Sequence, residues 1–213
     1  MNLTRIKFEM DDMATETWTH AEQWQQLIQR GRVAFKQIGT IYTRIFAAEN
    51  KLDDLDRPSD LRTMQRRIRL MYARLEIPFH IMRNILKSLA EIRDNTVRMY
   101  SRISLWMLDE NLVKHKIRPT LKATLLMETL EFLRKRYDAE WEVKEMVVIN
   151  LEQIENPNDL EILVEAWSDC RHTGGTPFLR KMGTFYDAVG RRRALVLFTE
   201  RGIHTLYGRG SDD

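Results

Sequence analysis

The chain has 213 residues, of which 43% are hydrophobic and 31% charged, which allows one domain with a core beneath a highly charged surface. Its 9 Gly and 5 Pro are too few for the many turns of a β-sandwich or β-barrel. The 34 Lys and Arg against 31 Asp and Glu leave a net charge of only +3, which does not by itself indicate a nucleic-acid-binding protein.

Cysteine content and hydropathy indicate a location. Cys170 is the single cysteine and has no partner for an internal disulfide, which is typical of a reducing compartment. No apolar run approaches the ~18 residues of a membrane span. Residues 1–12 lack the basic start and apolar core of a secretory signal. We therefore expect a protein of the cytoplasm and nucleus that does not enter a membrane.

The first long segment, from about Trp18 to Asn50, has the periodicity of a helix. Large apolar residues and one glycine recur at every seventh position, namely Trp24, Gly31, Ile38 and Ile45. With the apolar pairs between them, they form one stripe along a helix. The acidic residues 50–58 end in a proline and are predicted to be a loop.

The second segment has the clearest period in the sequence. Apolar side chains step by three and four residues, first at Leu61, Met64, Ile68, Met71 and Leu75, and again from Met82 to Trp106. Pro78 falls within this series, where it removes a backbone donor and clashes with the preceding turn. Because the phase is unbroken across the proline, we predict one long helix that is kinked near residues 75–78.

Two shorter helices are expected to follow. The first begins at Pro119-Thr120, and its stripe is Leu126, Leu130, Leu133 and Tyr137. The second begins at Asn156-Pro157-Asn158-Asp159, where Asn suits the cap, Pro the first turn and Asp the helix dipole. The whole pattern predicts an all-α fold, an antiparallel bundle of about four helices with one long kinked central helix.

The composition changes after Gly174-Gly175. From residue 171 onward, eight Lys and Arg stand against four Asp and Glu. Two β-like runs, Ala194–Phe198 and Ile203–Tyr207, are spaced for a short hairpin, which is marginal alone in water. The predicted organisation is an N-terminal extension (1–17), a helical bundle domain (18–170) and a basic C-terminal tail (171–213).

No motif in the sequence favours catalysis. Paired carboxylates such as Asp11-Asp12 and Asp53-Asp54 lie in segments that we expect to be exposed, whereas a catalytic pair needs a pocket that separates two pKa values. No two of the five histidines have a helical metal-binding spacing. Gly174-Gly175 lacks the Lys-Ser/Thr of a nucleotide-binding loop. We predict a non-catalytic protein without a cofactor or metal.

The sequence contains two basic runs, and only one of them is a candidate for contact with a partner. Arg191, Arg192 and Arg193 lie among few other charges and are candidates for nucleic-acid binding or nuclear targeting. The second run lies on the second segment and fits an ordinary solvated helix face; it comprises Arg62, Arg66, Arg67, Arg69 and Arg74.

Four of the five tryptophans divide into two groups. Trp24, Trp106 and Trp167 fall on apolar stripes and are predicted to be core residues. Trp141 stands among charged residues, so a core position and an exposed interface anchor fit it equally well.

The order of hydrophobic and basic positions in the middle of the chain is similar to that of a known family. The stretch Pro58-Ser59-Asp60-Leu61, through Ile92-Arg93-Asp94 to Met99-Tyr100, resembles the central helix of the AIRIM family, small ribosome maturation factors that associate with AAA ATPases. Met127 to Tyr137, an acidic-aromatic run through Trp141, and a short helix ending Glu165-Ala166-Trp167 resemble its C-terminal half. The resemblance covers about residues 24–167 and does not extend past Gly174.

This resemblance implies an adaptor. The family works with a double-ring AAA ATPase pair and a second small helical protein, the cyclin-dependent-kinase-two-interacting protein. Together they promote late maturation of the large ribosomal subunit by removing and recycling assembly factors, so the pre-ribosomal particle is an indirect partner. The candidate partner-binding residues are the basic-Tyr centre of the third helix and the tryptophan beyond it: Arg134, Lys135, Arg136, Tyr137 and Trp141.

Three alternatives stay open. One is a relative of the cyclin-dependent-kinase-two-interacting protein, acting in the cell cycle and replication. Another is an RNA-binding helical protein that uses the basic tail, with steep salt dependence. The third is a coiled-coil subunit of the cytoskeleton or kinetochore that pairs with itself in parallel, and Pro78 at a seam position argues against it.

Overall fold

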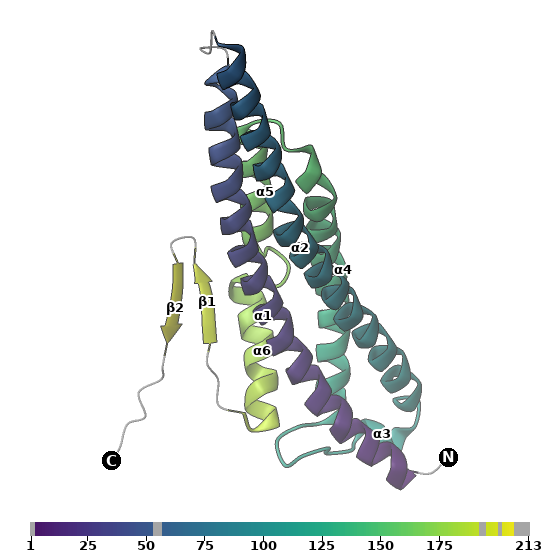
Figure 1. The fold of residues 1–213 in the computed structure, drawn as a ribbon. Helices are drawn as coiled ribbons and strands as arrows, with labels where there is room; N and C mark the ends of the chain where they lie inside the picture. The colour runs from purple at the N-terminus through teal and green to yellow at the C-terminus, as the bar shows by residue number, and fades with distance from the viewer. Residues whose placement is uncertain (1–2, 53–56, 192–194, 200–201, 207–213) are drawn as a thin grey trace. The chain divides into compact units, whose positions relative to one another are not determined.

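The computed structural model describes residues 3–52, 57–191, 195–199 and 202–206, and the fold is the predicted all-α one (Figure 1). The helices are α1 (Leu3–Glu49), α2 (Pro58–Trp106), α3 (Glu110–Val113), α4 (Ala123–Ile149), the 3₁₀ turn η2 (Asn150–Gln153), α5 (Pro157–Ser168) and α6 (Gly175–Val189). Strands β1 (Leu195–Thr199) and β2 (Gly202–Leu206) pair antiparallel, with Phe198 opposite Ile203, which confirms the predicted hairpin.

Helix α1 begins at Leu3, so the prediction of a separate extension over residues 1–17 is wrong. The apolar stripe continues toward the N-terminus at the helical spacing, and Ile6, Met10, Met13 and Ala14 are buried. The polar residues that gave this stretch its mixed appearance, such as Asp12, occupy the exposed positions between them. The same stripe that was recognised from Trp24 onward therefore starts about five turns earlier.

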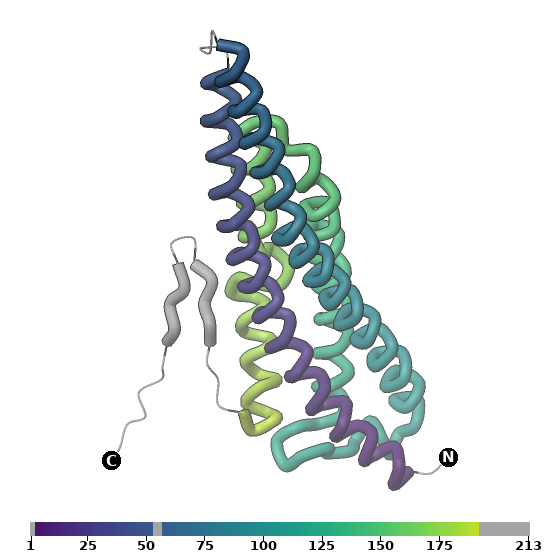
Figure 2. Tube along the Cα trace, in the orientation of Figure 1, coloured from purple at the N-terminus to yellow at the C-terminus, as the bar shows by residue number. Residues whose placement is uncertain are grey.

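Helix α2 is one helix from Pro58 to Trp106 and passes through Pro78, as predicted (Figure 2). Proline cannot donate to the carbonyl of the preceding turn. Its neighbours on the stripe hold the segment in the core, because Leu75 and Met82 are buried and Pro78 itself is buried as well. The bend expected near residues 75–78 stays a prediction.

The chain forms two compact units that are discontinuous in sequence. Unit 1 comprises Met1–Glu22, Ile92–Glu140 and Cys170–Asp213; unit 2 comprises Gln23–Glu91 and Trp141–Asp169. Helices α1, α2 and α4 each contribute one segment to both units, while α6 belongs to unit 1 and α5 to unit 2. The predicted boundary at residue 170 therefore does not separate a bundle from a tail.

Unit 1 incorporates much of the region that was predicted to be a basic tail. Helix α6 buries Phe178, Met182 and Phe185, and the Phe178 ring lies 5.9 Å from that of Phe132 on α4. The tail prediction followed the net charge of residues 171–213 and missed these apolar residues, which recur every three to four positions. Residues 175–189 are part of the folded core.

The start of α4 also differs from the prediction. The helix begins at Ala123, not at Pro119-Thr120, and a short helix α3 precedes it. The Thr120 hydroxyl donates a 2.7 Å hydrogen bond to the carbonyl of Ala188. Pro119 and Thr120 therefore belong to a connecting loop. The predicted stripe on α4 is confirmed, since Leu126, Leu130, Leu133 and Tyr137 are all buried.

Unit 2 closes around Trp167 of α5. The start of α5 is the predicted one, because the Asn156 side chain accepts hydrogen bonds from the backbone N–H groups of residues 158 and 159 and Asp159 completes a capping box. At the other end of α5, the buried Trp167 indole donates a 3.2 Å hydrogen bond to the carbonyl of Ile28 on α1. The Phe35 ring lies 5.8 Å away.

Gly31 makes room for the Trp167 indole. A Cβ at this position would lie 2.2 Å from Cζ2 of that ring, far inside van der Waals contact. Alanine in a helix is ordinarily favoured over glycine by roughly 1 kcal/mol. We expect Gly31→Ala to destabilise the protein instead and to lower the free energy of unfolding by about 1–3 kcal/mol. The added methyl group would force α1 and the buried Trp167 ring apart.

Gly39 supplies the matched control on the same helix. A Cβ at Gly39 would meet only Leu160 Cδ2, at an ordinary 3.9 Å, so Gly39→Ala should raise stability by about 0.5–1 kcal/mol. Chemical denaturation of both variants measures the difference. Equal effects of the two substitutions would show that Gly31 does not accommodate the indole.

Candidate functional site

The basic-Tyr centre of α4 faces largely inward. Tyr137 has no exposed surface, and burial, with a smaller contribution from Tyr186, raises the pKa of its phenol well above the ordinary value. Its prediction as a partner-binding residue is wrong for this structure, because the fourth position of the Leu126–Tyr137 stripe points into the core of unit 1.

The three basic side chains beside Tyr137 make contacts within unit 1. The Arg134 guanidinium lies 4.9 Å from the centre of the Tyr100 ring, and that of Arg136 lies 5.2 Å from the Phe132 ring. Lys135 Nζ is 2.8 Å from a carboxylate oxygen of Glu131, and this hydrogen bond lowers the pKa of Glu131. Lys135 is the most exposed of the three; the other two are half-buried. Only Lys135 is fully accessible to a partner.

Trp141, in unit 2, is half-buried. Its indole N–H donates a 3.4 Å hydrogen bond to the carbonyl of Leu86 on α2. Trp141 is therefore neither fully in the core nor fully exposed as an interface anchor, the two positions that its sequence context left open. Trp106, which was predicted to be a core residue, is also half-buried, and the Arg102 guanidinium covers its ring at 5.2 Å.

Arg191 is the one residue of the basic run 191–193 that lies within the described residues; Arg192 and Arg193 lie outside them. Its guanidinium lies 4.0 Å from the centre of the Trp18 ring on α1. Its backbone N–H donates to the carbonyl of Tyr186, at the end of α6 where Gly190 adopts a left-handed conformation (φ 77°). Arg191 therefore helps to terminate a helix and packs on an aromatic ring.

A buried carboxylate that the sequence did not indicate lies near the end of the unit 1 segment of α4. Glu140 is 1% exposed, and its Oε2 accepts hydrogen bonds from the backbone N–H groups of His172 (2.9 Å) and Thr173 (3.1 Å). The carboxylate thereby fixes the turn that leads into α6. Charged residues are mostly exposed, so composition offered no reason to place this one inside.

Removal of this carboxylate should loosen the turn. We expect Glu140→Ala to lower the free energy of unfolding by about 1–3 kcal/mol, because it leaves two N–H groups without their acceptor in a largely buried site. Glu128, on the same helix, pairs with Lys181 at 3.1 Å but is 57% exposed, so Glu128→Ala should cost less than about 1 kcal/mol. Urea denaturation of both variants would contradict this assignment if their losses were equal.

Lys144 is a second buried charge with a structural contact. Its side chain is 0% exposed, and Nζ donates to the carbonyls of Ala166 (3.0 Å) and Asp169 (3.2 Å) at the C-terminal end of α5. The ammonium also lies 5.7 Å from the Trp167 ring. A cation suits the carbonyl-rich end of a helix. Lys144 therefore caps α5 and closes the Trp167 site.

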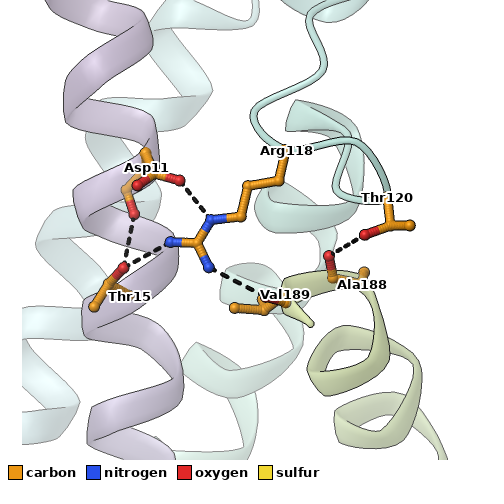
Figure 3. A network of polar contacts seen from close by, with 6 residues as sticks. All are labelled: Asp11, Thr15, Arg118, Thr120, Ala188 and Val189. Atoms are coloured by element: carbon orange, nitrogen blue, oxygen red, sulfur yellow. Dashed lines mark hydrogen bonds and ion pairs between the residues drawn. The ribbon is translucent and has the colours of Figure 1, made fainter. Parts of the chain in front are cut away.

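Arg118 connects three segments of unit 1 (Figure 3). Its guanidinium lies 2.5 Å from the carboxylate of Asp11, and it also donates to the Thr15 hydroxyl at 2.8 Å. A third bond, of 3.3 Å, reaches the carbonyl of Val189 at the end of α6. The side chain is 25% exposed, so solvent screens these contacts only in part. The network joins the loop before α4 to α1 and to α6.

In contrast to these internal contacts, the N-terminal part of α2 in unit 2 exposes a face with many positive charges. Six arginines are exposed here, Arg57 just before the helix and Arg62, Arg66, Arg67, Arg69 and Arg74 within it. Two acidic residues of the same segment are exposed as well, Asp60 and Glu76, and Glu76 pairs with Arg83 at 3.1 Å. None of the six forms an ion pair with a residue that the structure describes. Leu70 and Ile77, on the same segment, are 57% and 70% exposed. An apolar surface of this kind beside positive charge is suited to binding.

No group of three His, Cys, Asp or Glu residues within the described part of the chain is arranged to hold a metal ion. None of the described helices combines the length and apolar composition of a membrane-spanning segment.

Neither a protein-family model nor a curated protein matches the sequence.

Proposed function

We propose that the chain is a non-catalytic helical adaptor of a AAA ATPase complex, acting in late maturation of the large ribosomal subunit in the cytoplasm and nucleus. Its resemblance to the AIRIM family supports the identity of the complex. Its partners would then be a double-ring AAA ATPase pair and a second small helical protein. The release and recycling of assembly factors would be driven by the ATPase, so the adaptor itself needs no chemistry.

The observation that carries the adaptor role is the contrast between buried charged side chains, which bind the protein's own backbone, and exposed ones, which are accessible to a partner. The buried Glu140 and Lys144 bind backbone groups of the turn before α6 and of the end of α5. The exposed face of α2, in contrast, combines Leu70 and Ile77 with arginines that have no ion-pair partner among the described residues. Fixed internal contacts together with an open, partly apolar helix face are what a protein-binding module requires.

Affinity purification of the tagged full chain from its own cells, followed by quantitative mass spectrometry, tests this proposal. One half of each sample is treated with nuclease before washing. The proposal predicts that the ATPase pair, the second helical protein and large-subunit assembly factors are enriched. It further predicts that the ATPase remains after nuclease treatment, because its contact is with protein. Kinases, replication factors or cytoskeletal subunits without the ATPase would overturn the proposal.

RNA binding through the basic tail is the second candidate, because Arg191, the described residue of the run 191–193, is exposed. The Arg191→Ala/Arg192→Ala/Arg193→Ala variant should then lose RNA affinity, and binding by the unmodified chain should weaken steeply with salt. Titration of a labelled single-stranded RNA at two salt concentrations measures both. Binding that ignores salt, or that survives the triple substitution, would exclude this candidate.

A further inference from the structure

The exposed face of α2 has the arrangement of a helix-docking surface. Leu70, Ala73 and Ile77 are separated by three and four residues, so they lie on one side of the helix, and all three are exposed. This is the spacing of an apolar seam in paired helices. The core side of the same segment is separate, because Ile68, Met71 and Leu75 are buried.

Arginines border this seam on both sides. At about 100° of rotation per residue, Arg62 and Arg69 fall to one side of Leu70, and Arg67 and Arg74 to the other. Arg66 lies on the seam itself, one turn before Leu70. Since these five side chains are exposed and have no carboxylate partner among the described residues, their charges are available to another molecule.

We propose that this face binds an acidic amphipathic helix of a partner protein. The partner helix would carry apolar residues spaced by three and four positions, with Asp and Glu on its flanks. The inference rests on the proposed adaptor function and names the chemistry of one of its contacts. The apolar seam supplies the buried centre of the interface, and the arginines supply a complementary rim that favours acidic partners.

The apolar seam favours protein over RNA as the occupant. A phosphate backbone would satisfy the arginines, but it would set Leu70 and Ile77 against charged oxygens and return no apolar contact. An acidic helix satisfies both kinds of side chain at once. Arginine side chains also form bidentate bonds with carboxylates as readily as with phosphates.

A second copy of the chain offers a weaker match. On α5, Ile162 is 54% exposed and stands beside Glu161 and Glu165, so this helix has the right charge. It presents one large apolar side chain to a seam of three residues. Pairing α2 of one copy with α5 of the next is also a heterologous contact, which builds rings or open chains unless it closes. Pairing α2 with any other helix of the next copy is heterologous in the same way, so a different protein is the better occupant.

Site-specific photo-crosslinking tests the proposal in the full chain. Benzoyl-phenylalanine is incorporated in place of Ala73, and in a control protein in place of Gln26, an exposed residue of α1 in the same unit. After irradiation in cells, the adducts are identified by mass spectrometry. The proposal predicts that position 73 crosslinks to a segment rich in Asp and Glu with apolar residues spaced by three and four, and that position 26 does not.

Two variants then test the two components of the surface. Arg66→Glu/Arg69→Glu and Leu70→Ser/Ile77→Ser should each reduce the adduct at position 73 about tenfold or more, the equivalent of one factor of ten in affinity. Arg30→Glu/Lys36→Glu carries the same change of charge on exposed residues of α1 that form no ion pair within the described part of the chain, and it should leave the adduct unchanged. Circular dichroism melting of each variant confirms that the fold is retained.

Several outcomes would overturn the inference. They are a nuclease-sensitive adduct with RNA, an adduct with any peptide of the chain itself, no adduct above the level at position 26, and equal losses in the two charge variants. Failure of the proposed function is distinguishable: an acidic helix crosslinked at position 73 without the ATPase in the purified complex would retain the inference and remove the ribosomal assignment. Recovery of the ATPase without an acidic helix crosslinked at position 73 would retain the ribosomal assignment and remove the inference.

Discussion

Replacing Trp167 with alanine is expected to lower the free energy of unfolding by about 3–5 kcal/mol, the range observed when a buried aromatic residue is truncated. Trp167 is fully buried, donates a hydrogen bond to Ile28 and contacts Phe35. The substitution removes all of these contacts and leaves a cavity beside Gly31, which has no side chain to fill it. Equilibrium denaturation, followed by far-UV circular dichroism, measures the loss.

Trp106→Ala is the control for this change. The Trp106 ring is half-buried and is covered by Arg102, so its removal should cost clearly less than the removal of Trp167. If the two substitutions were equally destabilising, or if Trp167→Ala were nearly neutral, α5 would not pack on α1 through this residue.

Leu133→Ala should lower the free energy of unfolding by about 2–5 kcal/mol, because it creates a cavity in the core of unit 1. Leu133 is 1% exposed and lies between Leu130 and Tyr137 on the α4 stripe, both of them at 0%. Leu108 is 83% exposed, so Leu108→Ala should change the stability by less than about 0.5 kcal/mol. An unchanged melting temperature for Leu133→Ala would show that the stripe faces solvent or an absent partner.

The sequence predicted the parts of the fold that depend on local periodicity. The seven-residue spacing of Trp24, Ile38 and Ile45 matches a fully buried face of α1, since a period of 3.5 to 3.6 residues is a property of any amphipathic helix. The continuous phase on either side of Pro78 predicted one helix, and α2 is one helix. The α5 start was predictable because a capping box is formed by residues within one turn.

The remaining features depend on contacts between residues far apart in the sequence. Gly31 occupied a position on an apolar stripe without an evident reason, and only the approach of Trp167 explains the absence of a side chain there. Nothing local in the sequence marks Glu140 and Lys144 for burial, because most charges are exposed and their backbone partners lie 22 to 33 residues away in the chain.

The candidate partner-binding residues illustrate the same limit. The sequence placed Tyr137 on the apolar stripe of α4 and also made it a candidate for partner binding. Because Tyr137 is fully buried, it is a core residue. The arginines of α2 were interpreted as an ordinary solvated face. Exposed Leu70 and Ile77 between them change that interpretation, because they put an apolar seam on the same side of the helix. Their exposure could not be determined before the position of the core face was known.

The most direct test of the adaptor role compares three tagged full-length chains by quantitative affinity purification after nuclease treatment: the unmodified chain, Arg66→Glu/Arg69→Glu, and Arg30→Glu/Lys36→Glu. We predict that the unmodified chain recovers a AAA ATPase with large-subunit assembly factors. We also predict that one or more proteins of this set fall about tenfold with the α2 variant alone. Recovery of no ATPase by the unmodified, folded chain would contradict the central claim.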